Sequence, residues 1–175
     1  MPRLVHTAFL TETERSEIRA LLVSAFPEDS TEVNLGHAWG GMHAMVWEDG
    51  ELLAHGSVVM RRLLHGGAGL RTGYIEAVAV RADRRRQGLG AAVMASLETV
   101  VRGAYEIGAL SASDAGIPLY EHIGWLRWQG TASVITPTGI IRTPEEDDCI
   151  FVLPVTAQLN LTGDLACDWR AGDLW

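Results

Sequence analysis

The residues best suited to chemistry gather in one basic loop. Arginine occupies positions 81 and 84–86, and Gly88 and Gly90 follow. An apolar stretch precedes the loop, and a helical pattern follows it. The first turn of a helix offers unpaired N–H groups and a positive dipole end. Glycines let a ligand approach the backbone closely, and arginines add charge-assisted hydrogen bonds. This combination predicts a site for a pyrophosphate.

The loop differs from two common nucleotide-binding motifs. It lacks the G-x-x-x-x-G-K-[ST] pattern, the chain has no lysine to reach a γ-phosphate, and G-x-G-x-x-G is absent. It matches [RQ]-x-x-G-x-[GA], at Arg85-Arg86-Gln87-Gly88-Leu89-Gly90. The loop and the strand before it therefore resemble the acyl-CoA-binding motif of the GNAT superfamily of N-acetyltransferases.

A second motif follows at the expected separation. The stretch 118–125, P-L-Y-E-H-I-G-W, is similar to the L-Y-x-x-x-G-[FW] segment of the same superfamily, in which the tyrosine faces the CoA sulfur. The alternative is that Tyr120 only packs a helix against a strand.

Several further segments narrow the resemblance. Residues 40–44, 73–77, 142–147 and the tail 167–175 look like those of the aminoglycoside 2′-N-acetyltransferases. The resemblance extends from Leu4 to Trp175. The tail is its most specific part, because generic superfamily members lack it.

The resemblance implies an α/β fold and a bound co-substrate. We expect a single GNAT-type domain over residues 1–175, with a mixed, mostly antiparallel sheet flanked by helices and a splayed pair of central strands. The tail 156–175 would contribute to the substrate site. The strand backbone at Val78 and Val80 would pair with the pantetheine arm of acetyl-CoA. The implied CoA-binding residues are Val78, Val80, Arg85, Arg86, Gln87, Gly88, Leu89, Gly90 and Ala91.

The resemblance also implies catalytic and acceptor residues. Glu76 would act as general base through water, and Tyr120 as general acid to the thiolate. The implied aminoglycoside-binding residues are Asp29, Asn34, Glu76, Ser111, Glu146, Asp173 and Trp175 with its carboxylate. Relatives can carry an acid where this chain has Asn34, which would weaken one amine contact. They can carry Asp in place of Glu146, which changes the reach of that carboxylate.

The residues themselves agree with this chemistry. An amine at pH 7 is mostly ammonium and must lose a proton before it attacks a thioester. Glu76 lies in an apolar stretch, and a carboxylate with a reference pKa of about 4.3 needs desolvation or a water relay to act as base. The alternative is a structural ion pair with an arginine such as Arg71. A phenol, with a reference pKa of about 10, can donate a hydrogen bond to the departing thiolate.

The cysteines and histidines indicate no further centre. Cys149 and Cys167 form no C-x-x-C pair, and the six histidines include no H-x-x-x-H pair, so we expect neither a metal nor a disulfide. Neither cysteine has a base beside it in the sequence. We therefore expect direct transfer in a ternary complex, with no covalent intermediate.

The charge of the chain favours a cationic acceptor. The 175 residues carry a net charge of −8, and all 14 basic residues are arginines. An acidic chain disfavours general binding to nucleic acids or anionic membranes. The acids at 28–29, 145–148, 164, 168 and 173 could attract a polyamine. With no apolar leader or span, we expect a cytoplasmic protein. Homodimers are common in the family, which favours a homodimer.

Two other functions stay open. The same fold could acetylate another amine, such as a polyamine, a cell-wall amino sugar or a protein N-terminus. The chain could also be a non-catalytic acyl-CoA sensor, although Glu76 and Tyr120 speak against this.

The elements that must position these residues follow from periodicity. Strands are expected at 4–10, 42–47, 51–64, 70–81, 107–111, 125–134 and 149–155, and helices at 11–26, 88–101 and 115–123. Asp49-Gly50 predicts a hairpin, and Thr11 with Glu14 predicts a capping box. Residues 66–69 are expected to form a turn, and 28–41 and 136–148 loops, the former with a short helix over 31–39 as an alternative. The tail 156–175 shows no clear periodicity.

Overall fold

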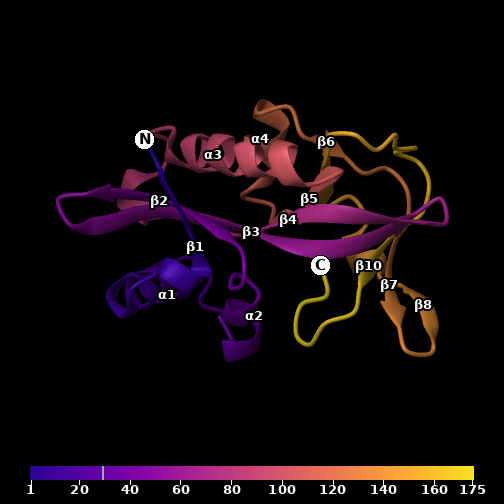
Figure 1. Ribbon diagram of the computed structural model, residues 1–175, viewed down its shortest axis with the longest axis horizontal. Helices are drawn as coiled ribbons and strands as arrows, with labels where there is room; N and C mark the ends of the chain where they lie inside the picture. The colour runs from indigo at the N-terminus through magenta and orange to yellow at the C-terminus, as the bar shows by residue number, and fades with distance from the viewer. Residues whose placement is uncertain (29) are drawn as a thin grey trace. The chain divides into compact units, whose positions relative to one another are not determined.

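The computed structural model describes residues 1–28 and 30–175. They form two compact units: unit 1 holds Met1–Val59 and Ile75–Val100, and unit 2 holds Met60–Tyr74 and Val101–Trp175. Two long strands, β3 (Glu51–His65) and β4 (Ala68–Val80), and helix α3 (Leu89–Ala104) run through both units (Figure 1). The expectation of one domain over residues 1–175 stays a prediction.

The strands of unit 1 form an antiparallel meander, as the sequence predicts. Strand β1 (Arg3–His6) pairs with β2 (Met42–Glu48), and β2 pairs with β3. Asp49 and Gly50, with φ of 51° and 83°, close the β2–β3 hairpin, and two left-handed residues are typical of a tight type I′ turn. The first strand is shorter than expected, because a 3-10 turn, η1 (Thr7–Phe9), follows His6.

Helices cover both faces of these strands in unit 1 (Figure 1). Helix α1 (Glu12–Ala25) begins at a capping box, in which the Thr11 hydroxyl accepts from the Glu14 N–H and the Glu14 carboxylate accepts from the Thr11 N–H. With the short helix α2 (Glu32–Gly36), it packs one core cluster, whose buried members are Leu10, Ile18, Leu21, Leu22, Leu35, Met45, Leu52 and Ala79. Helix α3 covers the other face so closely that a Cβ on Gly56 would lie 2.8 Å from Val93.

Unit 2 is built around a mixed sheet. Along it, the strands are ordered β6 (Leu126–Arg127), β9 (Ile150–Pro154), β5 (Ile107–Ser111), β4, β3, β10 (Leu165–Asp168), β7 (Ala132–Thr136) and β8 (Gly139–Arg142). The pairs β4–β5 and β10–β7 are parallel, and the other pairs recorded in this unit are antiparallel. Helix α4 (Ile117–His122) follows β5. The predicted α/β class and mixed sheet are confirmed.

The structure differs from the sequence predictions, or adds to them, at four places in this unit. The strand expected over 125–134 is two strands, β6 and β7, which pair with different partners. The expected loop over 136–148 contains β8 and a 3-10 turn, η3 (Pro144–Glu146). The expected turn over 66–69 needs only Gly66 and Gly67, both with positive φ. The tail contains β10, which lies between β3 and β7.

Pairing between β4 and β5 covers only a short part of each strand. The pairs run from Thr72↔Ile107 to Tyr74↔Ala109, while β4 continues to Val80 and β5 to Ser111. The backbone of β4 beyond Tyr74 is therefore left without β5 as a partner. This is the predicted splaying of the two central strands. Over the described residues, no helix is long and apolar enough to cross a membrane.

Candidate active site

The basic loop of unit 1 has the geometry of an anion site. After β4 come the 3-10 turn η2 (Ala82–Arg84) and then α3, whose first intrahelical bond runs from the Ala92 N–H to the Gly88 carbonyl. The N–H groups at the start of α3 therefore precede the helical ladder. Gly88 has a φ of 79°, is exposed, and has open space where a Cβ would be. This surface fits the pyrophosphate of CoA.

The four arginines of this loop differ in what they already bind. Arg81 forms ion pairs with Asp83, at 2.7 Å, and with Glu51, and Arg84 pairs with Glu48. Arg85 donates to the Val80 carbonyl, at 3.3 Å. In the described part of the chain, no carboxylate pairs with Arg85 or Arg86. Two of the four charges are thus neutralised inside the protein, and Arg85 and Arg86 remain for a ligand.

Glu76 lies half-buried on β4, two residues after the last pair with β5. The next residue, Ala77, has a φ of 54°, and this left-handed backbone costs an alanine about 1–2 kcal/mol. Ala77 therefore interrupts the regular pleat of β4 directly after the predicted base. The structure places Val78 and Val80 on the segment of β4 that β5 does not pair.

A further residue of unit 1 that is predicted to bind the aminoglycoside, Asn34, lies in α2. Asn34 is half-buried there, and its N–H donates to the Thr31 hydroxyl at the start of the helix. Asp29 lies outside the described residues.

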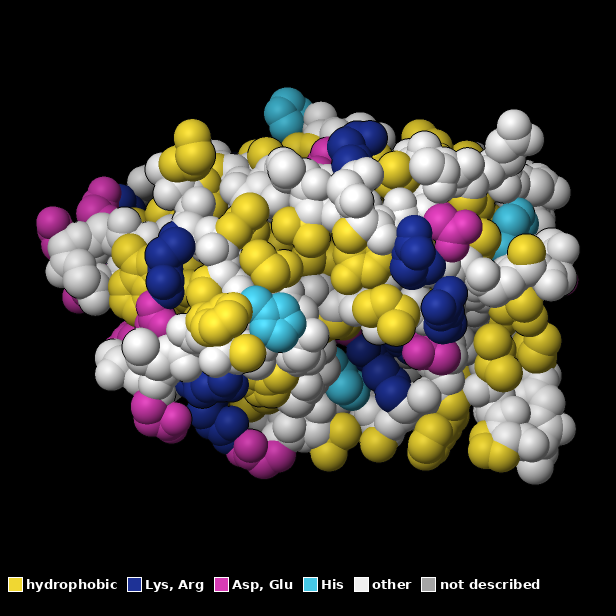
Figure 2. Space-filling model, viewed as in Figure 1, with side chains coloured by type: hydrophobic (Ala, Val, Ile, Leu, Met, Phe, Trp, Pro, Cys, Tyr) yellow, Lys and Arg dark blue, Asp and Glu magenta, His cyan; other side chains and the backbone are white. Residues whose placement is uncertain are grey.

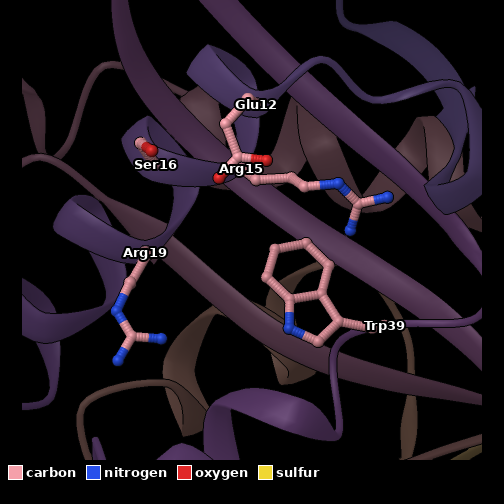
Figure 3. A pocket seen from close by; sticks show the side chains of 5 residues that line it. All are labelled: Glu12, Arg15, Ser16, Arg19 and Trp39. Atoms are coloured by element: carbon pink, nitrogen blue, oxygen red, sulfur yellow. The ribbon is translucent and has the colours of Figure 1, made fainter.

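A shallow pocket lies between α1 and Trp39, at residues that the sequence did not indicate (Figure 3). Its lining consists of Glu12, Arg15, Ser16, Arg19 and Trp39. The cations are already engaged: Arg15 donates to the Thr7 carbonyl and stacks 5.5 Å from the Trp39 ring centroid, and Arg19 pairs with Glu32. The pocket adds no residue to the predicted site.

In unit 2, Tyr120 lies on α4 and is almost fully buried. Its ring packs beside Phe151 and Trp125, with centroids 5.8 and 6.4 Å away. Burial raises the pKa of the Tyr120 phenol to about 12. The phenol is therefore protonated at neutral pH and available as a hydrogen-bond donor. Full proton transfer to a thiolate, whose conjugate acid has a pKa of about 8.5, would be uphill.

Two predicted acceptor residues meet directly. The Ser111 hydroxyl, at the end of β5, donates to the Glu146 carboxylate at 2.7 Å, although 35 positions separate them. Burial raises the pKa of Glu146, as do the nearby charges of Glu145 and Asp173, while the Ser111 bond and Arg170 lower it. Burial is the largest of these effects, because the carboxylate lies in a half-buried, partly desolvated position.

The tail of unit 2 is fixed by side chains from distant parts of the sequence. The Trp175 indole N–H donates to the Thr143 hydroxyl at 3.0 Å, and both residues are buried. Arg170 donates to the main-chain oxygens of Asp173 and Trp175, at 2.6 and 2.9 Å, and its Cζ lies 5.6 Å from the Tyr74 ring centroid. Arg170 thus holds the segment that carries two predicted acceptor residues.

The acidic field of unit 2 is smaller than the sequence suggests. Asp168 pairs with the buried Arg61 at 2.8 Å, and Asp147 pairs with Arg142 at 2.7 Å. The charges of these two carboxylates are therefore already balanced by arginines of the protein. Glu146 and Asp173 are the acids of this region that the sequence analysis assigns to the acceptor.

Neither cysteine has the environment of a nucleophile. Burial raises the pKa of Cys149, and it raises that of Cys167 to about 11. Both thiols therefore stay protonated near neutral pH, and the thiolate is the reactive form. These environments support transfer without a cysteinyl intermediate.

Two structural features were not predicted from the sequence. One is the pair Arg170 and Thr143, which hold the tail, because each acts on a partner far away or in a segment without periodicity. The other is a buried pair in unit 1, His43 and His55. The predicted Asp49-Gly50 hairpin could have revealed this pair. Its register places His43 opposite Ser57 and Met45 opposite His55, so the two histidines are diagonal neighbours on adjacent strands.

Comparison with known proteins identifies the family. The sequence model of the acetyltransferase (GNAT) family matches residues 9–125. An aminoglycoside 2′-N-acetyltransferase of Mycolicibacterium fortuitum is 50% identical over 177 aligned positions, covering 99% of this chain and 91% of that protein. The chain belongs to the GNAT acetyltransferases, among the aminoglycoside 2′-N-acetyltransferases. The family resemblance seen in the sequence is thereby confirmed.

Solved structures show the same GNAT fold. The acetyltransferase YhbS of Escherichia coli, solved with CoA, has a TM-score of 0.65 at 15% identity, with 95% of this chain and 89% of that chain covered. A GNAT acetyltransferase of Brucella melitensis, solved with acetyl-CoA, has a TM-score of 0.61 at 17% identity, with 98% and 97% covered. Two further similar chains are longer, and this chain spans 33% of each.

Proposed function

We propose that this GNAT enzyme transfers the acetyl group of acetyl-CoA to the 2′-amine of an aminoglycoside and thereby confers resistance to the antibiotic. The observation that carries the proposal is 50% identity over 99% of the chain to an enzyme named for that reaction. The basic loop and the half-buried Ser111–Glu146 pair support it, because the loop suits a pyrophosphate anion and the pair suits an ammonium group.

In the proposed reaction, the two substrates react directly. Glu76, through a water molecule, takes a proton from the 2′-ammonium group. The free amine nitrogen forms a bond to the thioester carbonyl carbon, the carbon–sulfur bond breaks, and the sulfur leaves as a thiolate. The Tyr120 phenol donates a hydrogen bond to that thiolate. The acylated nitrogen releases its second proton to solvent as the amide forms. The raised pKa keeps Tyr120 a stabilising hydrogen-bond donor, and solvent supplies the proton that converts the thiolate to the CoA thiol.

Binding of acetyl-CoA is assigned to unit 1. The amides at the start of α3, with Arg85, Arg86 and Gln87, would hold the pyrophosphate. The backbone of Val78 and Val80 would pair with the pantetheine arm, because β5 does not occupy that part of β4.

Binding of the aminoglycoside is assigned to carboxylates and hydroxyls. Ser111, Glu146 and Asp173 would contact amines and hydroxyls of the antibiotic, and Trp175 would position the tail. Asn34 and Asp29 complete the proposed set. We treat residues 1–175 as one catalytic domain, to which the tail contributes acceptor contacts, and we expect it to act in the cytoplasm.

We expect a homodimer, and β8 is the surface that supports it. All four residues of this edge strand are exposed, with Ile140 at 58% and Ile141 at 53%, and Figure 2 shows apolar side chains over the β7–β8 hairpin. Exposed apolar edge strands favour pairing with another chain. Light scattering should give twice the monomer mass, and Ile141→Lys should lower it. A monomeric wild-type protein would contradict this expectation.

Mass spectrometry of the products tests the proposed function. Tobramycin and gentamicin carry a 2′-amine and should each gain one acetyl group, whereas amikacin, with a 2′-hydroxyl, should gain none. Spermidine and an amino sugar should give much lower kcat/KM than tobramycin. Failure to acetylate any 2′-amino compound would overturn the proposal. A higher kcat/KM for another amine would make the antibiotic a secondary substrate.

A further inference from the structure

A buried chain of hydrogen bonds in unit 1 ends at the peptide that follows Glu76. The Thr7 hydroxyl lies 2.7 Å from His43 Nε2, His43 Nδ1 lies 2.9 Å from His55 Nε2, and His55 Nδ1 lies 2.9 Å from the Ala77 carbonyl oxygen. Both histidines are fully buried. The proposed reaction uses neither of them.

The carbonyl at one end fixes every proton in this chain. A carbonyl oxygen can only accept, so His55 must carry its proton on Nδ1. A neutral His55 then has a lone pair on Nε2, which accepts from His43 Nδ1–H. His43 Nε2 can then only accept, so the Thr7 hydroxyl proton points to it at 2.7 Å rather than to the Gly41 carbonyl at 3.1 Å. The Thr7 oxygen accepts from the Gly40 N–H at 2.9 Å. Each ring therefore has one tautomer.

Both rings have the neutral charge that this arrangement needs. Burial is the main cause that lowers the pKa of His43 to about 3, with smaller contributions from His55, Arg15 and His6. Burial also lowers the pKa of His55 to about 4, against the opposing effect of its bond to Ala77.

The bond from His55 sets the direction of the next N–H. The peptide between Ala77 and Val78 is trans and planar, so its N–H points opposite to its C=O. With the Ala77 oxygen held on His55, the Val78 N–H is directed away from that ring. The same bond stabilises the left-handed conformation of Ala77, which an alanine adopts only when its surroundings enforce it.

We infer that His55, locked in its Nδ1–H tautomer by His43 and Thr7, is a positioning residue that aims the Val78 N–H at the acyl-pantetheine arm of acetyl-CoA. The inference rests on the proposed function, which assigns the Val78 backbone to that arm. His55 itself touches no reacting atom.

Variants at position 55 separate this role from a packing role. His55→Asn keeps an N–H donor close to the Nδ1 position, whereas His55→Gln and His55→Leu lose it. For Gln and Leu we expect the Kd of acetyl-CoA to rise about threefold to tenfold, the range that one hydrogen bond supplies. Asn should stay within about twofold of wild type, and KM for tobramycin should not change. Ser133→Ala, a buried polar residue on β7, is the control and should keep the wild-type Kd.

The result that overturns the inference is an equal Kd for the Asn, Gln and Leu variants, or a rise in KM for both substrates together. Calorimetric binding of acetyl-CoA requires no turnover. If the wild type binds acetyl-CoA but acetylates no antibiotic, the proposed function fails while the variants still decide the role of His55.

The tautomer can also be measured in the intact wild-type enzyme, whether or not the variants fold. Two-bond proton–nitrogen NMR correlations at pH 7 should show neutral rings with Nδ1–H at both His43 and His55. An Nε2–H tautomer or a charged ring at His55 would refute the inference.

Discussion

The phosphate loop of unit 1 and the tail region of unit 2 are built in opposite ways. The loop uses consecutive residues, 81–91, and relies on backbone N–H groups and glycines. The tail region brings together Ser111 with Glu146 and Trp175 with Thr143, pairs that lie 35 and 32 positions apart. Backbone groups suit a ligand that a whole superfamily shares, whereas side chains can be exchanged to suit a particular acceptor. We therefore expect specificity for the acceptor to be encoded in the side chains of the tail region.

We expect variants in the phosphate loop to raise KM for acetyl-CoA alone. Variants in the tail region should raise KM for the aminoglycoside alone. Glu76 is the exception, because it belongs to the reaction step. Glu76→Gln should lower kcat by about 100- to 10,000-fold, the range typical of a lost general base, while the Kd of acetyl-CoA stays unchanged. Steady-state kinetics and calorimetry measure the two quantities, with the exposed Glu17→Gln as control. Wild-type turnover in Glu76→Gln would remove Glu76 as the base.

The largest effect expected within unit 2 is at Glu146. Glu146→Gln should raise KM for tobramycin by about tenfold or more, because a charged hydrogen bond to an ammonium group is lost. The KM for acetyl-CoA should not change. An equal rise in both constants would show that the two regions are not separate.

The pH dependence of the wild type sharpens this test. Because burial raises the pKa of Glu146, more of the carboxyl is neutral under mildly acidic conditions than for an ordinary glutamate. We expect kcat/KM for tobramycin to rise as the pH increases through that raised pKa. The kcat/KM of Glu146→Gln should not show this rise. A raised pKa on folding also means that ionisation of Glu146 costs stability as pH increases. Glu146→Gln should therefore unfold no earlier than wild type at pH 7.

Within unit 1, two arginines of one loop provide a matched pair. Arg86→Ala should raise KM for acetyl-CoA by about threefold to tenfold, because a charge available to the pyrophosphate is lost. Arg84→Ala should leave this KM nearly unchanged, because Arg84 already pairs with Glu48. Titration of CoA into each variant measures whether Arg86→Ala weakens binding more than Arg84→Ala does. Equal losses would mean that the loop acts through its total charge.

The smallest effect is expected at the tail anchor. Trp175→Phe keeps an aromatic ring but removes the N–H that donates to Thr143, and it should raise KM for tobramycin about threefold. Thr143→Val should have a similar effect. The double variant should be no worse than either single one, because both remove the same bond. Additive losses in this cycle would show that the two residues act independently.

The sequence predicted the regions in which chemistry is local. The strand, the basic loop, the helix, the capping box and the Asp49-Gly50 hairpin each depend on neighbouring residues, and all of them are present. It did not predict β10 or β8, because each owes its pairing to strands elsewhere in the chain. The division of the arginine cluster also escaped it, since Glu48 and Glu51 reach the loop only through the β2–β3 hairpin. The His43–His55 pair depends on the same hairpin register.

The position of the acetyl group on the product is the most direct test of the proposed 2′-N-acetylation. Tobramycin offers several amines, so NMR of the purified mono-acetylated product distinguishes the site of transfer from mere activity. We expect the single product formed with acetyl-CoA to carry its acetyl group on the 2′-nitrogen. Acetylation at another nitrogen, or a mixture of positions, would contradict it.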